Sequence, residues 1–353
     1  MSILPPLKIF DSKNFMLQEC QRLLIISEGF EERSLEWVKS LPLTKIFENC
    51  FVFKNVPERK SRLKELVPEI QKRTHQQEKE LDYNRLDPIK SEYEMIETLS
   101  NKLEKADEIV VDVSVMSKLL ITIIIFLLRS FNGNVRFIYS EPENYIPSEE
   151  DYNKFREGMA SMVSFPTFGV HDVVRTPLLT STTMQNSPSI LVTFTSFNEQ
   201  LIRALLSNIS PSHLFLINGT PPHLKWRAKA TQEIHKDIIQ EYDQDNPIVN
   251  GDHLLRQTST LDYRETFDIL TGIYKKYCYT NRIILSPTGS KMQAVGSAFL
   301  KICCPDVHIE YPTPESFFIE GFSSTKIRNV HELYIERFQS FWEGVADRQG
   351  LNG

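Results

Sequence analysis

Short apolar runs alternate along the chain with polar turns and with longer segments of helical periodicity. The first run, Leu23 to Ile26, ends in a polar turn, and apolar residues follow at Leu35, Val38 and Leu41. A short apolar run before a turn predicts a buried strand, and a spacing of three to four residues predicts an amphipathic helix. The pattern therefore predicts repeated units of strand, turn and helix.

The same pattern recurs in both halves of the chain. In the first half it predicts strands over 23–26, 51–53, 109–113 and 135–139, with a helix over 114–128. Residues 58–105 are rich in charge and contain no glycine, so they are predicted to be helical. In the second half the pattern predicts strands over 189–194, 214–217, 282–285 and 307–311, a polar helix over 223–245 and a small-residue helix after 291.

This alternation determines the expected fold class. Strands that alternate with helices indicate right-handed crossovers and mostly parallel sheets. We therefore expect an α/β protein with two Rossmann-like halves. The predicted domains are a first half over 1–145, a connector over 146–188, a second half over 189–322 and a C-terminal helix over 323–353, most clearly amphipathic over 325–346.

The two halves also share residues at matching positions. Tyr139 to Tyr145 (YSEPENY) aligns with Tyr311 to Phe317 (YPTPESF), and Ser114 aligns with Ser286. The spacing between the aligned positions is nearly constant. One unit used twice explains this match better than chance similarity, so the sequence predicts an internal duplication.

Composition narrows the classes of partner. The chain is 41% hydrophobic and 24% charged, with a formal net charge of -6, which disfavours binding of nucleic acid over a broad basic face. The five cysteines form no Cys-x-x-Cys pair, as is typical of reduced cysteines in a cytoplasmic protein. The N-terminus lacks the apolar stretch of a signal peptide. We therefore expect a cytoplasmic protein.

The most apolar segment runs from Ile109 to Leu128. It contains Asp112 and Lys118, and its apolar run, Leu119 to Leu128, is much shorter than the roughly 20 residues that a membrane-spanning helix needs. A buried strand, a polar turn and a buried helix explain the segment better. No association with a membrane is expected.

The turn after the predicted strand 282–285 is the strongest candidate for a ligand site. In open α/β sheets, ligands bind beyond the carboxyl ends of the strands, and a helix N-terminus there favours an anion. The predicted ligand-binding residues of this turn are Ser286, Thr288, Gly289, Ser290 and Lys291. The turn is not a Walker A loop, because the first glycine and the spacing are missing. The alternative is a well-capped helix with a solvated Lys291.

The equivalent turn in the first half keeps serine and lysine but has no glycine. Its candidate residues are Asp112, Ser114, Ser117 and Lys118. An acidic residue at the strand end suits a ribose hydroxyl or a partner loop better than a phosphate. Capping of the helix by Asp112 or Ser114 is the alternative.

Other strand ends supply further candidates. Phe30 and Phe197 stand at helix starts, where they stack on a base or form a hydrophobic staple. For Tyr139 and Tyr311, packing in the core is the alternative to stacking on a ligand. The remaining ligand-binding candidates are Ser27, Glu28, Gly29, Thr195, Ser196, Asn198, Asn218, Tyr139 and Tyr311.

Known catalytic and cofactor motifs are absent from the sequence. The turns that begin at Ser27 and at Ser286 both lack the pair of glycines that flanks the serine of a nucleophile elbow. The eight histidines form no metal-binding motif, and no Gly-x-Gly-x-x-Gly dinucleotide fingerprint is present. We therefore expect neither a bound cofactor nor a metal, and the catalytic residues of an enzyme are not identified.

The turn from Ser286 to Lys291 resembles the one that marks the CRISPR-associated Rossmann fold sensors. In that family a strand leads through a turn rich in threonine and glycine, ending in lysine, into a small-residue helix. The turn from Asp112 to Lys118 is a degenerate version, and the family's second glycine is replaced by Ser290. The resemblance covers about residues 20–145 and 189–320. It implies two fused sensor halves that bind a cyclic oligonucleotide.

Three hypotheses follow. The leading one is a nucleotide-sensing or regulatory module of a prokaryotic defence-type system. Since no effector domain is visible in the sequence, the resemblance implies a stand-alone sensor, a regulator of a separate effector protein, or an enzyme that degrades the signal. The second hypothesis is an enzyme that acts on a nucleotide or a phosphorylated sugar. The third is a scaffold that presents the C-terminal helix to a partner.

Overall fold

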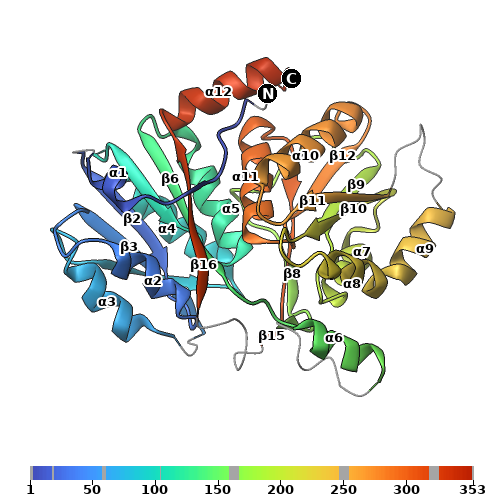
Figure 1. Ribbon diagram of the computed structural model, residues 1–353. Coiled ribbons are helices and arrows are strands. Elements are labelled where there is room, and N and C mark those ends of the chain that lie inside the picture. Colours follow the sequence, from blue (N-terminus) through green and yellow to red (C-terminus); the bar gives the residue numbers. More distant parts are fainter. Residues whose placement is uncertain are drawn as a thin grey trace. The chain divides into compact units, whose positions relative to one another are not determined.

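The computed structural model describes residues 3–17, 20–57, 61–103, 105–158, 167–245, 254–317 and 326–351 (Figure 1). The chain forms two compact units. Unit 1 comprises Met1–Ser117, Leu127–Tyr145 and Ile319–Val345, and unit 2 comprises Lys118–Phe126, Ile146–Phe318 and Ala346–Gly353.

A sheet of seven strands, in the order β1-β16-β6-β5-β2-β3-β4, forms the centre of unit 1. Five strands run parallel, and β16 and β1 add to the sheet in antiparallel pairs. The strands are β1 (Lys8–Ile9), β2 (Arg22–Ser27), β3 (Asn49–Val56), β4 (Lys79–Asn84), β5 (Glu108–Asp112), β6 (Asn134–Pro142) and β16 (Ile327–Ile335). The helices are α1 (Ser12–Leu17), α2 (Arg33–Ser40), α3 (Leu63–Gln71) and α4 (Pro88–Leu103), with a 3-10 turn, η1, over Leu128–Ser130.

A parallel sheet of five strands, in the order β11-β10-β9-β12-β13, forms the centre of unit 2. Its strands are β9 (Ser189–Phe194), β10 (His213–Thr220), β11 (Leu255–Ser259), β12 (Arg282–Ser286) and β13 (His308–Ile309). Two short antiparallel pairs join β8 (Asp172–Val174) to β14 (Tyr311–Thr313) and β7 (Thr167–Phe168) to β15 (Ser316–Phe317). The helices are α6 (Glu149–Arg156), α7 (Gln200–Ile209), α8 (Trp226–Ile234), α9 (Lys236–Asp245), α10 (Tyr263–Tyr277) and α11 (Lys291–Cys303).

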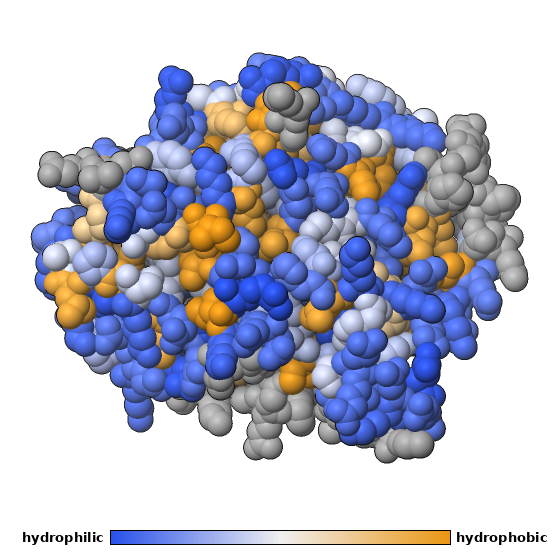
Figure 2. Space-filling model, viewed as in Figure 1, coloured by the Kyte–Doolittle hydropathy of each residue, from blue (hydrophilic) through white to orange (hydrophobic). Residues whose placement is uncertain are grey.

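Two further helices complete the chain. Helix α5 (Lys118–Leu127) lies in unit 2 as far as Phe126, and the boundary between the units falls within α12 (Phe338–Gln349). All but the ends of α5 are buried, so the apolar run of the sequence is a buried helix of ten residues. Among the described residues, no helix combines the length and the apolar character needed to cross a membrane. The face seen in Figure 2 is largely hydrophilic, with small apolar patches between polar residues.

The strand order confirms two Rossmann-like halves with mostly parallel sheets. In each sheet the first parallel strand is central, the next two lie on one side, and the last two lie on the other: β4-β3-β2-β5-β6 in unit 1 and β11-β10-β9-β12-β13 in unit 2. Descent of the two halves from one duplicated unit remains a prediction.

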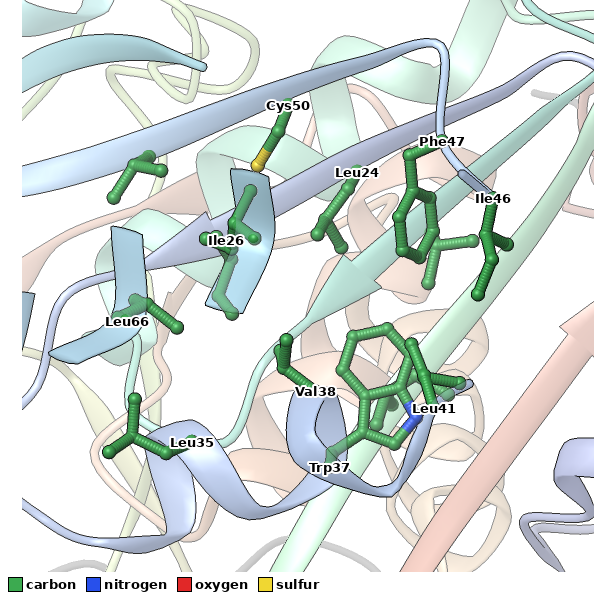
Figure 3. Close-up of a cluster of buried hydrophobic side chains, with 14 of the residues drawn as sticks. Leu24, Ile26, Leu35, Trp37, Val38, Leu41, Ile46, Phe47, Cys50 and Leu66 are labelled. Atoms are coloured by element: carbon green, nitrogen blue, oxygen red, sulfur yellow. The ribbon is translucent and has the colours of Figure 1, made fainter. Parts of the chain in front are cut away.

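The core of unit 1 shows how the apolar runs form these elements. Leu24 and Ile26 of β2 are fully buried and pack against Leu35, Trp37 and Val38 of α2 (Figure 3). These strand positions alternate, and Leu35 and Val38 recur at helical spacing, as burial against one face requires. In unit 2, an equivalent cluster joins β9, β10 and β12 to α7 and α9.

Two predicted helical regions contain strands instead. Residues 58–105 include β4, whose Leu81 and Tyr83 are buried while the residues between and before them are exposed. The helix predicted over 325–346 is wrong in its first part, because β16 occupies Ile327–Ile335 and α12 begins only at Phe338. Residues 318–325, where this helix was expected to begin, lie outside the described part of the chain.

Candidate functional site

Each parallel sheet has a switch point, where the chain stops adding strands on one side and continues on the other. It lies between β2 and β5 in unit 1, and between β9 and β12 in unit 2. In open α/β sheets the crevice at the carboxyl ends of these two strands is the usual ligand site. The strongest predicted residues follow β5 and β12, so they lie at these two places.

In unit 2, Ser290 is the N-cap of α11. Its hydroxyl accepts a hydrogen bond from Gln293 N (3.1 Å) and donates one to Thr260 O (2.6 Å). The Gln293 side chain completes a capping box by accepting from Ser290 N (2.7 Å). Ser290 therefore caps the helix, which was the alternative to ligand binding, and its hydroxyl already has two partners.

The buried side chain of Gln293 was not among the predicted residues. Its Nε2 donates to Thr258 Oγ1 (2.8 Å), which ties the start of α11 to β11. A Cβ at Gly289 would lie 2.3 Å from Gln293 Oε1, so a side chain here would require the Gln293 amide to move. The Ser-x-x-Gln spacing from Ser290 to Gln293 is the sequence signal that identifies this pair.

Thr288 connects the turn to the neighbouring strand. Its Oγ1 donates to Phe194 O (2.7 Å), accepts from Phe194 N (3.1 Å) and lies 3.0 Å from Thr193 Oγ1. These bonds join the ends of β9 and β12 across the switch point. Thr288 therefore positions the turn, and its hydroxyl has no remaining hydrogen for a ligand.

Ser286 is the last residue of β12. It is fully buried, and its Oγ has no hydrogen-bond partner among the described residues. Side chains alternate along a strand, so Ser286 shares a sheet face with Ile284, which belongs to the cluster beneath α7. Lys291, at the start of α11, is half-buried. The turn therefore has a buried hydroxyl at Ser286, the half-buried backbone of a glycine at Gly289 and the positive charge of Lys291.

The predicted residues at the ends of β9 and β10 form hydrogen bonds within the protein. Asn218 Oδ1 accepts from Thr195 Oγ1 and Thr231 Oγ1, both at 2.7 Å, and Asn218 Nδ2 donates to Ala228 O (2.7 Å). Ser196 Oγ accepts from Asn198 N at 3.2 Å. These side chains shape the edge of the sheet by bonding to each other.

In unit 1, Asp112 is the last residue of β5 and corresponds to Ser286 when the residues are counted from the strand ends. Ser114, which the sequence alignment pairs with Ser286, lies two positions further on. Asp112 Oδ1 accepts from Ser114 N (2.9 Å) and Ser114 Oγ (2.5 Å), and Ser114 Oγ in turn accepts from Ser140 N (2.8 Å). Asp112 Oδ2 and Ser140 Oγ are buried and have no partner among the described residues. Burial raises the pKa of Asp112 to about 6.

Arg33 is the charged group that acts on Asp112. Arg33 forms a two-point ion pair with Glu31, both bonds at 2.9 Å, and donates to Ser140 O (3.2 Å). Its charge is therefore already balanced by Glu31. The first switch point therefore suits a hydrogen-bond donor better than an anion.

The remaining predicted residues of unit 1 have structural partners. Ser27 Oγ lies 3.3 Å from Phe53 O, and a Cβ at Gly29 would meet Val115 at 2.8 Å. Ser117 Oγ donates to Tyr83 Oη (3.1 Å).

Lys118 is half-buried, whereas Tyr139 and Tyr311 are buried. Burial lowers the pKa of Lys118, at the start of α5, to about 8. Tyr139 is buried in β6, where its ring stacks on His331 at 6.2 Å between centroids, and burial raises its pKa. Tyr311 is buried in β14. Both tyrosine rings lie in packed surroundings.

Comparison with known proteins gives little further information. No family model matches the sequence, and no curated protein matches it. Among solved structures, the chain is similar to a Type III CRISPR defence DNA nuclease activated by cyclic oligoadenylate, with a TM-score of 0.44 and 8% identity. The match covers 82% of this chain and 65% of that one. A similarity this low carries no argument about family or function.

Proposed function

We propose that the chain is a nucleotide-binding sensor or regulatory module whose ligand binds at the carboxyl edge of the sheets. The observation that carries this proposal is the chemistry at the last residue of the fourth parallel strand. In both units this residue is buried at the switch point and has a side-chain oxygen with no partner in the described part of the chain, Asp112 Oδ2 and Ser286 Oγ. Buried polar atoms normally have partners, so each such oxygen is a candidate for contact with a ligand.

The switch point of unit 2 suits the phosphate of such a ligand. Ser286 supplies a hydroxyl donor, Lys291 a positive charge, and the start of α11 the partial positive charge of a helix N-terminus. Gly289 lets the backbone approach closely because it has no side chain.

The switch point of unit 1 suits a different part of the ligand. The carboxyl group of Asp112 disfavours a phosphate, whereas a ribose hydroxyl can donate to Asp112 Oδ2. The two sites therefore have different chemistry.

The resemblance of the turn from Ser286 to Lys291 to that of CRISPR-associated Rossmann fold sensors supports a more specific version. In that version the ligand is a cyclic oligonucleotide, and the chain passes its bound state to a separate effector protein of a defence system.

Calorimetric titration of the full chain tests the proposal, with ATP and cyclic oligonucleotides of two to six nucleotides as probes. We expect saturable binding of at least one probe. We expect Lys291→Ala to weaken it about 10- to 150-fold, because a charge-assisted bond contributes roughly 1.5–3 kcal/mol. The control is Lys236→Ala, which removes the exposed lysine that begins α9.

Equal binding by Lys291→Ala and wild type, or no binding of any probe, would overturn the proposal. Chromatography of the nucleotide recovered after the titration distinguishes a sensor, which returns it unchanged, from an enzyme.

A further inference from the structure

A hollow of about 210 Å³ lies at the start of α7 in unit 2. It is smaller than the pockets of about 300–1,000 Å³ that hold drug-sized ligands, so it suits one part of a nucleotide rather than all of it. Its lining comes from β7, from the loop after β9 and from the first turn of α7: Thr167, Phe168, Phe197, Asn198, Glu199, Gln200 and Arg203.

The walls of the hollow are fixed by hydrogen bonds. Asn198 Nδ2 donates to Thr167 Oγ1 and to Gly169 O, both at 3.3 Å, and Gln200 Oε1 accepts from Gly169 N at 2.8 Å. The short β7 segment is thereby attached to the loop after β9. Because β9 is a switch-point strand, the hollow belongs to the same edge of the sheet as the proposed ligand site.

Phe197 forms the inner wall. Its ring packs against Tyr152 and Trp226, with centroids 6.1 and 6.2 Å away, and the guanidinium of Arg227 lies 4.4 Å from its centre. Phe197 is 8% exposed, so its ring is part of the packing rather than a surface for stacking.

Phe168, Gln200 and Arg203 are the exposed residues of the hollow. Phe168 is 47% exposed, and its strand pairs with β15. Arg203 has a 49% exposed side chain and pairs with Glu199 one turn earlier on α7. An exposed ion pair of this kind contributes little to stability, so Arg203 can exchange partners at small cost.

We infer that this hollow is the base-binding subsite of the nucleotide site, with Phe168 as the stacking surface and Arg203 beside it. The inference rests on the proposed function. An exposed aromatic face with an adjacent guanidinium is the combination on which nucleobases stack in proteins that bind single strands. Stacking accepts any base, so the subsite adds affinity for a nucleotide over inorganic phosphates without selecting one base.

Titration of the full chain with ATP and with inorganic tripolyphosphate tests this inference, because the two probes share a triphosphate and differ in the nucleoside. Wild type should bind ATP more tightly than tripolyphosphate. Phe168→Leu keeps an apolar side chain but removes the aromatic face, and should weaken ATP binding about 5- to 100-fold. Its binding of tripolyphosphate should not change. Phe168→Trp should restore or strengthen ATP binding.

The control is Tyr279→Leu, which removes an aromatic ring that is 81% exposed and lies after α10, away from the hollow. Binding of ATP that both Phe168 variants leave unchanged would overturn the inference alone. A loss of ATP and tripolyphosphate binding together in Phe168→Leu would also overturn it, since that result indicates a disturbed fold. Binding of neither probe to wild type would overturn the inference together with the proposed phosphate site.

Discussion

At the scale of the residue, Asp112 is the clearest case of a side chain that folding alone does not explain. Its carboxyl group is fully buried, one oxygen has no partner among the described residues, and Arg33, the nearest cation, is already paired with Glu31. Burial therefore raises the pKa of Asp112 from 3.8 to about 6. The ionised form destabilises the folded chain, and a ligand that donates to the free oxygen would remove this cost.

Asp112→Asn should change how stability depends on pH. Because the pKa of Asp112 is raised in the folded chain, the contribution of Asp112 to the stability of wild type is fully present below about pH 4. This contribution is lost as the pH rises through about 6. Relative to wild type, the variant should gain about 3 kcal/mol in free energy of unfolding between pH 4 and pH 8, at roughly 1.4 kcal/mol per pKa unit. Urea denaturation at the two pH values measures the change.

The exposed Asp87 provides a control for this prediction, as Asp87→Asn should show no comparable change. A constant difference between Asp112→Asn and wild type across the pH range would show that Asp112 is not raised in pKa by its burial.

At the scale of the element, strands with a clear apolar run could be predicted from the sequence, whereas β4 and β16, whose buried residues alternate with polar ones, could not. Strand β2 is buried on every residue, so its run of leucine and isoleucine is unambiguous. Strand β4, at the edge of its sheet, buries two side chains among charged neighbours, and charged residues at this spacing also fit a helix. In β16 the buried residues His331, Leu333 and Ile335 alternate with less buried ones, which is the period of a strand. From the sequence, this segment and the aromatic residues of α12 are predicted as one helix, so the alternation is not recognised.

The candidate site could be located from the sequence, but the roles of its residues could not. The turn from Ser286 to Lys291 does lie at a switch point. However, Ser290 and Thr288 are engaged with Gln293 and Phe194, contacts that depend on which strands are neighbours. Phe168 is distant in sequence from this turn, and only the exposure of its ring in the folded chain identifies it.

The turn that begins α11 should be intolerant of a side chain at Gly289. A Cβ there would approach Gln293 Oε1 to 2.3 Å and displace the amide that completes the capping box. We expect Gly289→Ala to destabilise the chain by about 1–3 kcal/mol, through the lost cap and a buried amide without partners. Chemical denaturation measures the loss.

Gly272, inside α10, is the matched control. A Cβ there meets no atom within 4 Å, so Gly272→Ala should be neutral or stabilise by up to roughly 1 kcal/mol. Equal effects of the two alanine substitutions would contradict the role of Gly289.

At the scale of the whole molecule, the C-terminal segment completes the sheet of unit 1. Strand β16 pairs along β6 from Ile327 to Ile335 and carries β1 on its other edge. A chain that ends at Ser324 would lose β16 and the buried Phe338 and Trp342 of α12. We expect it to be unfolded or insoluble by circular dichroism and size-exclusion chromatography, whereas a chain that ends at Leu351 should behave as wild type. A soluble, folded product ending at Ser324 would contradict the structural role of β16.

The two units share a strand order but place different chemistry at its switch point: a serine and a lysine in one, and a buried carboxyl group in the other. The central claim is that the first of these sites, in unit 2, holds the phosphate of a nucleotide. A crystal structure of the full chain with ATP tests it most directly. We expect phosphate density within hydrogen-bonding distance of Ser286 Oγ and Lys291 Nζ at the start of α11. Nucleotide density at any other place, or a turn that stays empty at saturating ATP, would contradict it.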